Sequence, residues 1–254
     1  MLSSFPGGRA RARFRSIFLS DVHLGSPRAQ AELLLDFLAH NQAEFLFLVG
    51  DIADETDGAD EGSLAAWPEA HRAVLDSLRR MASEGTRVRY MTGNHDPRFG
   101  KLWGAAVALE IARELEHTTA DGRRLWIVHG DGFDEVVHRR RWLSRIGDAL
   151  ARGLEHACLA LERLFLARRG RLGRALRERC KGWLGYTQRF ERSAVFAARA
   201  RAMDGIICGH VHSAASRTID GLYYGNGGDW VGSGTALVEH VDGRMELLCW
   251  EPAA

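Results

Sequence analysis

The chain has 254 residues, of which 46% are hydrophobic and 26% are charged, and its formal net charge is +1. This size and composition are typical of one globular domain that buries a substantial core. No run of about eighteen apolar residues occurs, which excludes a membrane-spanning helix, and residues 1–13 lack the apolar stretch of a secretory signal. We expect a flexible N-terminus over residues 1–13 and a folded domain over residues 14–254.

Short apolar runs rich in β-forming residues alternate with helical patterns along the chain. In chain order we predict strands at residues 14–20, 45–50, 87–91, 125–129 and 205–208, and helices at residues 29–40 and 64–82. Further strands are predicted at residues 222–224, 235–240 and 245–250, with an Asp242-Gly243 turn that makes the last two a hairpin. This alternation predicts a layered α/β sheet.

A basic segment interrupts this pattern. Residues 138–201 carry seventeen Lys and Arg residues against five Asp and Glu residues. Apolar residues recur there at intervals of three and four from Trp142 to Phe165, which predicts a long amphipathic helix, and a second helical region follows a break near residues 170–173. We predict a helical insertion over residues 138–201, with a basic surface suited to anions such as nucleic acid, phospholipid headgroups or a phosphorylated substrate.

The cysteines and most of the histidines show no pattern that indicates a site. Cys158, Cys180, Cys208 and Cys249 form no C-x-x-C pair, which indicates thiols in a reducing compartment and predicts a cytoplasmic protein. Six histidines lack a partner at ligand spacing and are interpreted as structural or surface residues: His40, His71, His117, His138, His156 and His240.

Five short motifs fall where predicted strands end, and each contains a residue type that binds metals. They are Ser20-Asp21-Val22-His23, Gly50-Asp51, Gly93-Asn94-His95-Asp96, His129-Gly130-Asp131 and Gly209-His210-Val211-His212. Loops at the carboxyl ends of strands converge on the ligand crevice of α/β sheets, so one shared site is expected. Side chains two apart in an extended segment point the same way, which predicts that Asp21 pairs with His23, and His210 with His212.

The order of these motifs resembles the signature of the calcineurin-like metallophosphoesterases. The resemblance implies a four-layer α/β/β/α sandwich with a helical insertion. It also implies one metal ion held by Asp21, His23, Asp51 and His212, and a second held by Asp51, Asn94, His129 and His210, so that Asp51 bridges. Carboxylate, imidazole and amide ligands suit Mn²⁺, Fe or Zn²⁺, of which we expect Mn²⁺. Two such ions activate water, so no serine or cysteine nucleophile is needed.

Three further polar residues follow the ligand positions. His95 is a candidate general acid or a group that stabilises charge on the phosphoryl group, with a purely structural place beside Asn94 as the alternative. Asp96 is a candidate for fixing its tautomer, whereas Asp131 is expected to orient a ligand histidine. The acidic residues after Asp51 are predicted to form a solvated loop, with a place at the rim of the active site as the less favoured alternative; they are Asp54, Glu55, Asp57, Asp60 and Glu61.

Within the superfamily, the chain resembles the UDP-2,3-diacylglucosamine diphosphatase group of lipid A biosynthesis. The resemblance rests on residues 18–25, 48–52, 208–212, Gly228-Asp229-Trp230 and the helical insertion. It implies hydrolysis of the pyrophosphate of a nucleotide-linked glycolipid to UMP and a lipid monophosphate. His95 departs from the arginine of the best-known branch of that group, which indicates a paralogous branch.

The insertion has two interpretations. In one, Trp142, Leu143, Ile146 and Leu150 form part of an apolar cleft for acyl chains, and neighbouring arginines face phosphate or the inner face of the cytoplasmic membrane. In the other, the helices only pack on the core. A soluble phosphodiesterase or phosphomonoesterase for nucleotides therefore stays an alternative. A non-enzymatic module is disfavoured because all seven ligand positions are intact, and nucleic acid because few aromatic residues stand among the arginines.

Overall fold

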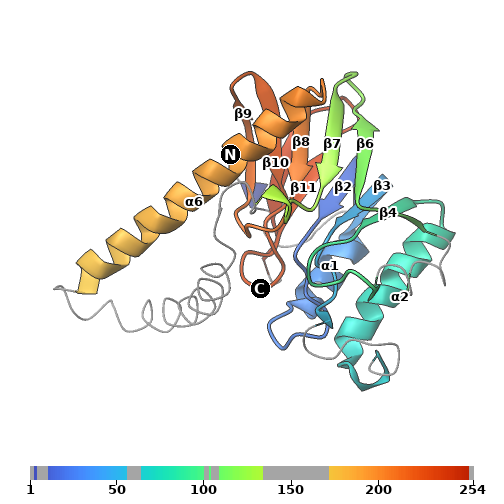
Figure 1. Ribbon diagram of the computed structural model, residues 1–254. Coiled ribbons are helices and arrows are strands. Elements are labelled where there is room, and N and C mark those ends of the chain that lie inside the picture. Colours follow the sequence, from blue (N-terminus) through green and yellow to red (C-terminus); the bar gives the residue numbers. More distant parts are fainter. Residues whose placement is uncertain are drawn as a thin grey trace. The chain divides into compact units, whose positions relative to one another are not determined.

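The computed structural model describes residues 3–4, 11–55, 64–99, 103, 109–133 and 172–251 (Figure 1). The chain divides into two compact units, one formed by Met1–Asp131 with Val195–Ala254 and the other by Gly132–Ala194. Of the predicted insertion, the structure describes residues 172–201. Trp142, Leu143, Ile146 and Leu150 lie outside the described residues.

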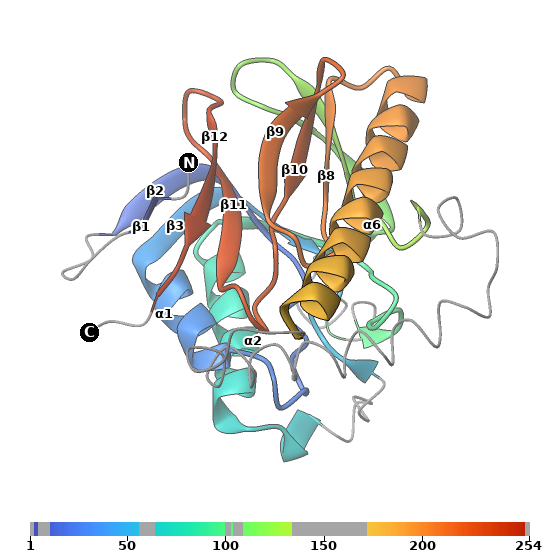
Figure 2. The same ribbon diagram turned by 90° about the vertical axis from the view of Figure 1, so that its left-hand side faces the viewer.

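Two sheets form the first unit. The seven-stranded sheet has the order β1-β12-β11-β2-β3-β4-β5, and the five-stranded sheet has the order β6-β7-β8-β10-β9. The strands of the larger sheet are β1 (Ser3–Ser4), β2 (Ala12–Leu19), β3 (Asn41–Val49), β4 (Arg87–Met91), β5 (Glu110–Ala112), β11 (Thr235–Glu239) and β12 (Met245–Cys249). Those of the smaller sheet are β6 (Glu114–Thr118), β7 (Arg124–Val128), β8 (Gly205–Cys208), β9 (Ala215–Ile219) and β10 (Leu222–Asn226). Figure 2 shows β8, β9 and β10 beside β11 and β12 of the larger sheet.

Strand direction places the motif loops at one edge of each sheet. Strands β2 to β5 run parallel to one another, and so do β7, β8 and β10. Strand β11 pairs antiparallel with β2 and with β12, and the last pair is the predicted hairpin. The carboxyl ends of β2, β3 and β4 therefore share one edge of the larger sheet.

Alternating side chains on the strands form two apolar layers. Along β2, Ile17 and Leu19 belong to the core that contains α1 (Ala31–His40) and α2 (Glu69–Ser83), whereas Phe18 belongs to the core between the sheets. Phe18 stacks on Phe47 of β3 at a ring separation of 4.8 Å. This period of two is the strand pattern that buries both faces of a central sheet.

A helix also ends against the smaller sheet. Helix α6 (Leu172–Ala200) confirms the second predicted helical region, and its last turns belong to the first unit, where Val195 and Ala198 are buried. Arg201 follows directly, and its guanidinium lies 4.1 Å from the ring centroid of Trp126 in β7. The α/β sandwich predicted from the resemblance is thus confirmed.

The second predicted helix begins later than expected. A 3-10 turn, η2 (Leu64–Ala66), comes first, and α2 starts only at Glu69, after Pro68. Proline disfavours the α conformation in the residue before it, so the helix cannot run through Trp67. Strands β5, β6 and β9 were not predicted, because charged residues break their apolar pattern: Glu110 in β5, Glu114 and Glu116 in β6, and Arg217 in β9.

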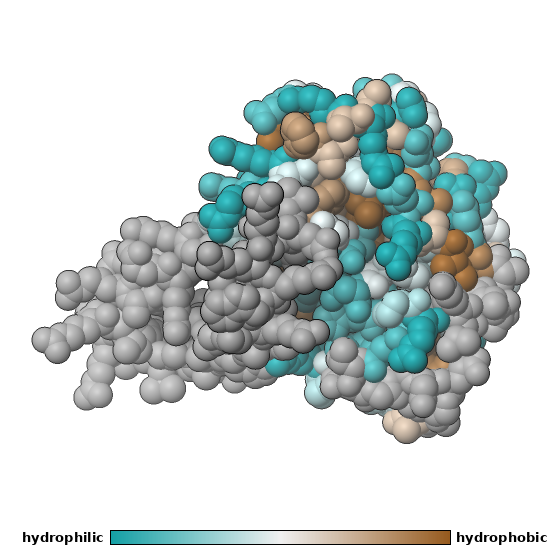
Figure 3. Space-filling view, viewed as in Figure 1, coloured by the Kyte–Doolittle hydropathy of each residue, from teal (hydrophilic) through white to brown (hydrophobic). Residues whose placement is uncertain are grey.

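The surface of the described residues is mostly hydrophilic on the face shown in Figure 3, where apolar residues form small separate groups. Within the described ranges, Phe196 and Val241 are the large apolar side chains that are strongly exposed, at 73% and 75%. The described helices include none that is long and apolar enough to cross a membrane.

Candidate metal centre

The predicted ligands follow five strands. Asp21 and His23 follow β2, Asp51 follows β3 and Asn94 follows β4, all in the larger sheet. The other three, His129, His210 and His212, follow β7 and β8 of the smaller sheet. Each ligand thus lies in a loop at the carboxyl end of a parallel strand, as predicted, and the two sheets contribute to one site.

The backbone of these loops is strained. Seven described residues other than glycine have a positive φ, and five of them are candidate ligands, namely Asp21, His23, Asp51, His210 and His212. A left-handed backbone costs such a residue about 1 kcal/mol or more, and it persists only where the surrounding structure imposes it. Asp21 and His23 do come together, as predicted, but the reason given for it was wrong, because their segment is not extended. Both residues have left-handed φ values, 54° and 53°.

Main-chain hydrogen bonds impose this conformation on the loop after β2. The amide of Asp21 donates to the Gly50 carbonyl at 3.1 Å, and the amides of Val22 and His23 both donate to the Asp51 carbonyl at 2.9 Å. From the other side, the Trp230 amide donates to the Asp21 carbonyl at 3.0 Å. The loops after β2 and β3 therefore form one braced unit.

Two glycines let the ligand side chains approach each other. A Cβ atom on Gly93 would overlap the Asp51 carboxylate, and one on Gly50 would overlap the His129 ring. Gly50 also has a φ of 78°, which favours glycine. The Gly-Asp and Gly-Asn-His motifs thus need glycine for space as well as for backbone conformation.

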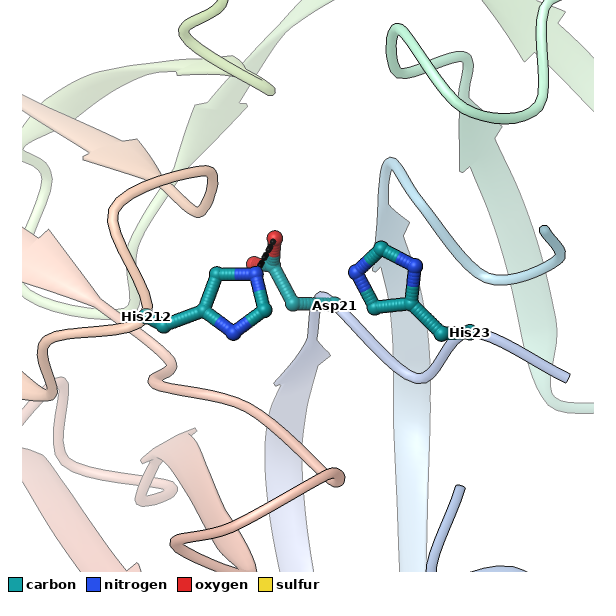
Figure 4. A group of neighbouring side chains, drawn as sticks. All are labelled: Asp21, His23 and His212. Carbon is teal, nitrogen blue, oxygen red and sulfur yellow. Dashed lines mark ion pairs between the residues drawn. The ribbon is translucent and has the colours of Figure 1, made fainter. Parts of the chain in front are cut away.

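Asp21, His23 and His212 form the first group (Figure 4), whose ligand atoms lie within 4.8 Å of one another. His212 Nε2 lies 3.3 Å from Asp21 Oδ1. His23 Nε2 is buried and has no hydrogen-bond partner. A buried nitrogen without a partner is costly, and a cation bound by this group would satisfy it.

Asp51, His129 and His210 form the second group, again within 4.8 Å. His129 is fully buried, and its Nδ1 donates to the Val49 carbonyl at 2.9 Å. Its Nε2 lies 3.3 Å from Asp51 Oδ2 and 3.2 Å from Asn94 Oδ1. The Val49 carbonyl therefore fixes the ring so that Nε2 is the atom directed to the other candidate ligands.

The charges of the second group are strongly coupled. Burial raises the pKa of the Asp51 carboxyl, but the charge and the hydrogen bond of His129, together with the charges of His23 and His95, hold that pKa well below its ordinary value. Burial lowers the pKa of His129, but the negative charge of Asp51 raises it to about 10. Burial raises the pKa of Asp21, but the charge and hydrogen bond of His212 and the charge of His129 together lower it below its ordinary value.

His95 contacts a carboxylate that sequence reasoning missed. Asp54 is buried, with Oδ1 at 3.4 Å from His95 Nδ1 and Oδ2 at 3.5 Å from His23 Nδ1. Asp54 was predicted to lie in a solvated loop, and so was Glu55, whose carboxylate accepts hydrogen bonds from the Arg98 and Phe99 amides. The only sequence signal for Asp54 is its place three residues after Asp51. Other acidic residues follow it closely, so composition alone did not distinguish it from a solvated loop.

Asp96 does not have the place predicted for it. Its carboxylate is fully buried and accepts hydrogen bonds from the Ile52 amide at 2.7 Å, the Gly93 amide at 2.6 Å and the Tyr90 hydroxyl at 2.5 Å. The carboxylate at His95 Nδ1 is Asp54 instead. Asp96 thus braces the loops after β3 and β4, and burial raises its pKa.

Asp131 also differs from its prediction. It is exposed, and the group that orients His129 is the Val49 carbonyl. Four of the histidines interpreted as structural or surface residues form a hydrogen bond or pair with a carboxylate away from the candidate ligands. His71 accepts from the Gly25 amide, His117 pairs with Glu239, His40 with Asp36 and His240 with Glu246. His138 and His156 lie outside the described residues.

The donor set fits divalent transition metals. Each group combines imidazole nitrogen with carboxylate oxygen, and Asn94 adds an amide oxygen beside the second group. Such mixed sets suit Mn²⁺, Fe and Zn²⁺, whereas Ca²⁺ and Mg²⁺ favour oxygen alone. The unpartnered Nε2 atom of His23 supports the same assignment.

Comparison with known proteins agrees with this chemistry. A family model described as calcineurin-like phosphoesterase matches residues 14–214. UDP-2,3-diacylglucosamine hydrolase of Pseudomonas aeruginosa is 27% identical over 216 residues, which cover 80% of this chain and 84% of that protein. The protein of the same name from Neisseria gonorrhoeae is 29% identical over 140 residues, which cover 50% of this chain and 56% of that one. A solved archaeal phosphodiesterase aligns with 92% of this chain and 98% of its own, with a TM-score of 0.50 at 12% identity, a likeness of fold alone.

Proposed function

Since the chain belongs to the calcineurin-like phosphoesterase family and is a metal-dependent hydrolase, we propose that it cleaves the pyrophosphate of a lipid-linked nucleotide such as UDP-2,3-diacylglucosamine. The products would be UMP and a lipid monophosphate. The observation that carries the phosphoesterase chemistry is the pair of ligand groups assembled from the ends of four strands, β2, β3, β7 and β8. The choice of substrate is supported by relatives named UDP-2,3-diacylglucosamine hydrolase.

The proposed ligands divide between two positions. Asp21, His23 and His212 would hold one ion, and Asn94, His129 and His210 the other, with Asp51 bridging. Two contacts of Asp51 support the bridging role. Its side chain belongs to the second group, and its main-chain carbonyl accepts a hydrogen bond from the amide of His23, which belongs to the first. When bound, two divalent cations neutralise charge on the phosphoryl oxygens and lower the pKa of water. We propose Mn²⁺ at both positions.

His95 is the proposed general acid. Its amide donates to Asp51 Oδ1 at 2.8 Å, which fixes the residue beside the ligands, and its side chain is partly exposed. The hydrogen bond to Asp54 raises the pKa of His95 above its ordinary value, which favours the protonated ring that a general acid needs. With Nδ1 directed to Asp54, Nε2 is the atom that can donate a proton to the leaving oxygen.

The substrate's acyl chains would contact the insertion. We propose that Trp142, Leu143, Ile146 and Leu150 form part of the apolar cleft, and that nearby arginines face phosphate or an anionic membrane. Each buried methylene contributes about 0.8 kcal/mol, and arginine binds phosphate through two hydrogen bonds. The arginine content of residues 138–201 supports a peripheral membrane role for a cytoplasmic enzyme.

A soluble nucleotide phosphodiesterase or phosphomonoesterase is the second candidate. His95 favours it, because the best-known branch of the diphosphatases has arginine at this position. The two candidates share the metal centre and differ in whether the substrate needs acyl chains.

The test is Mn²⁺-reconstituted activity on a panel that contains UDP-diacylglucosamine, a cyclic nucleotide and an aryl phosphodiester, with and without detergent. Release of UMP, with at least tenfold preference for the acylated substrate, is the expected result. An Asp51→Ala control should be inactive on every substrate. Comparable turnover of the small substrates would favour the soluble phosphodiesterase.

Polar substitutions at Ile146 and Leu150 separate the roles of the insertion. We expect them to weaken turnover of the acylated substrate far more than that of the aryl phosphodiester. Equal losses on both substrates would mean that these residues only support the fold.

A further inference from the structure

We propose that Asp229 is a positioning residue for His212, and that the segment from Asn226 to Trp230 organises the first ligand group. The inference rests on the proposed metal centre and extends it. Asp229 belongs to the Gly228-Asp229-Trp230 motif, whose role the metal ligands leave unexplained. It lies beyond residues 14–214, the part of the chain that the family model matches.

The Asp229 carboxylate is fixed before it reaches the histidine. It is buried, and its Oδ1 accepts hydrogen bonds from the amides of Val231 at 3.0 Å, Gly232 at 2.6 Å and Ser233 at 3.1 Å. The Ser233 hydroxyl contacts Oδ2 at 3.1 Å. Three amide donors hold the carboxylate in one orientation.

This fixed carboxylate faces the far side of the His212 ring. Asp229 Oδ2 lies 3.9 Å from His212 Nδ1, while Nε2 of the same ring lies 3.3 Å from Asp21 Oδ1. The ring therefore stands between two carboxylates, one in the ligand group and one behind it. A carboxylate behind a metal-binding histidine favours the tautomer with the proton on Nδ1 and leaves Nε2 for the metal.

The same segment holds the neighbouring loops. The Asn226 side chain is fully buried, and its Nδ2 donates to the Gly209 carbonyl at 2.8 Å, next to His210. Ser20 Oγ donates to the Gly228 carbonyl at 3.0 Å, and the Trp230 amide donates to the Asp21 carbonyl at 3.0 Å. The segment thus contacts both loops of the first group, those that carry Asp21 and His212.

The second group is positioned differently. His129 takes its orientation from the Val49 carbonyl of β3. Loss of the Asp229 carboxylate should therefore affect one metal position and spare the other, a selectivity that a general loss of folding would not produce.

The experiment is a Mn²⁺ titration of the purified protein, with free Mn²⁺ measured by electron paramagnetic resonance. Asp229→Asn keeps an oxygen for the three amides but removes the charge that faces Nδ1. We expect the wild type to bind two ions, and Asp229→Asn to bind one of them about 10- to 100-fold more weakly, the usual effect of removing such a carboxylate. Ser233→Ala, which removes the hydroxyl from Oδ2 but keeps the carboxylate and its three amide donors, should weaken that ion much less than Asp229→Asn does.

Two backgrounds show which position is affected. With His210→Ala, which damages the second group, Asp229→Asn should weaken the remaining ion by the same factor. With His212→Ala it should have no further effect, because Asp229 acts through that ring. Equal losses in both backgrounds, an equal loss in Ser233→Ala, or normal binding by Asp229→Asn would overturn the proposal. A wild type that binds no Mn²⁺ would instead refute the metal centre itself.

Discussion

At the scale of single residues, the site consists of histidine rings that lie next to buried carboxylates. His95 shows this best, because its backbone contacts Asp51 and its ring contacts Asp54. Neither contact involves the atom proposed to transfer a proton, so the role in catalysis can be separated from the role in metal binding.

His95→Ala should retain both metal ions and lose activity by about 10²- to 10⁴-fold, the usual contribution of a positioned acid. The backbone amide that contacts Asp51 remains in this variant. Metal content by elemental analysis and turnover of an aryl phosphodiester are the two measurements. A variant with normal turnover would show that His95 has no part in proton transfer.

Metal uptake should release protons near neutral pH. Burial lowers the pKa of His129, but the charge and hydrogen bond of Asp51, the charge of Asp21 and the Val49 hydrogen bond together raise it to about 10, so below that pH the metal-free ring carries a proton. Ligation needs the neutral ring. Mn²⁺ affinity should therefore rise with pH between 7 and 9, by about tenfold per unit for one proton released. Calorimetry in buffers of different ionisation enthalpy counts the protons, and an affinity independent of pH would contradict the coupling.

The positions of the candidate ligands at strand ends were predictable because each follows an apolar run that forms a buried strand. Asp54 was not, because its burial comes from the pairing of two loops, in which the Glu55 amide donates to the His95 carbonyl at 2.9 Å. Asp96 was wrongly placed because adjacency to His95 does not bring their side chains together. Asp96 is directed to the Ile52 and Gly93 amides and the Tyr90 hydroxyl. Contacts between loops are set by the tertiary fold, which spacing does not contain.

At the scale of elements, the site requires the main chain at the end of one strand to lie close to a side chain at the end of another. Gly50 directly follows β3 of the larger sheet and lies against the ring of His129, which directly follows β7 of the smaller sheet. The ends of these two strands therefore approach each other at Gly50. Glycine at this position serves the geometry of the site as well as the turn.

Gly50→Ala should reduce metal binding as well as stability. The new methyl group would overlap the His129 ring and would strain a residue whose φ is 78°. Gly122→Ala is the matched control, because Gly122 has a similar φ of 88° but nothing within 4 Å of the added Cβ. Both variants should lose about 1 kcal/mol from backbone strain, and Gly50→Ala should in addition lose Mn²⁺. Equal metal content in the two variants would show that the contact with His129 is unimportant.

At the scale of the whole molecule, a buried polar cluster joins the two sheets far along the strands from the ligands. His117 of β6 lies 2.7 Å from Glu239 of β11, and Ser16 of β2 donates to the same carboxylate. Burial raises the pKa of Glu239, but hydrogen bonds from His117, Ser16 and the Ala120 amide lower it below its ordinary value. Its charged form therefore stabilises the folded state above a pH of about 4.5.

Glu239→Gln should lower the free energy of unfolding at pH 7 by about 3 kcal/mol, because it leaves buried partners unmatched. The difference from the wild type should shrink as the pH falls through the lowered pKa of Glu239, where the wild type loses the same charge. Glu246→Gln is the control, since His240 and Glu246 are also 2.7 Å apart but partly exposed. It should cost less than about 1 kcal/mol. Denaturant unfolding at pH 7 and pH 4 measures both, and equal costs would show that burial is not decisive.

The candidate ligands come from both sheets and from both sides of residues 134–171 in the sequence, so cleavage of the chain in that segment would divide them between two fragments. A cut anywhere within residues 134–171 leaves Asp21, His23, Asp51, Asn94 and His129 on one fragment, and His210 and His212 on the other. The first fragment lacks a histidine for each ion, and the second has no carboxylate of either group. Recovery of Mn²⁺ binding on mixing the two fragments would therefore report that the halves had reassembled, without any need for a substrate.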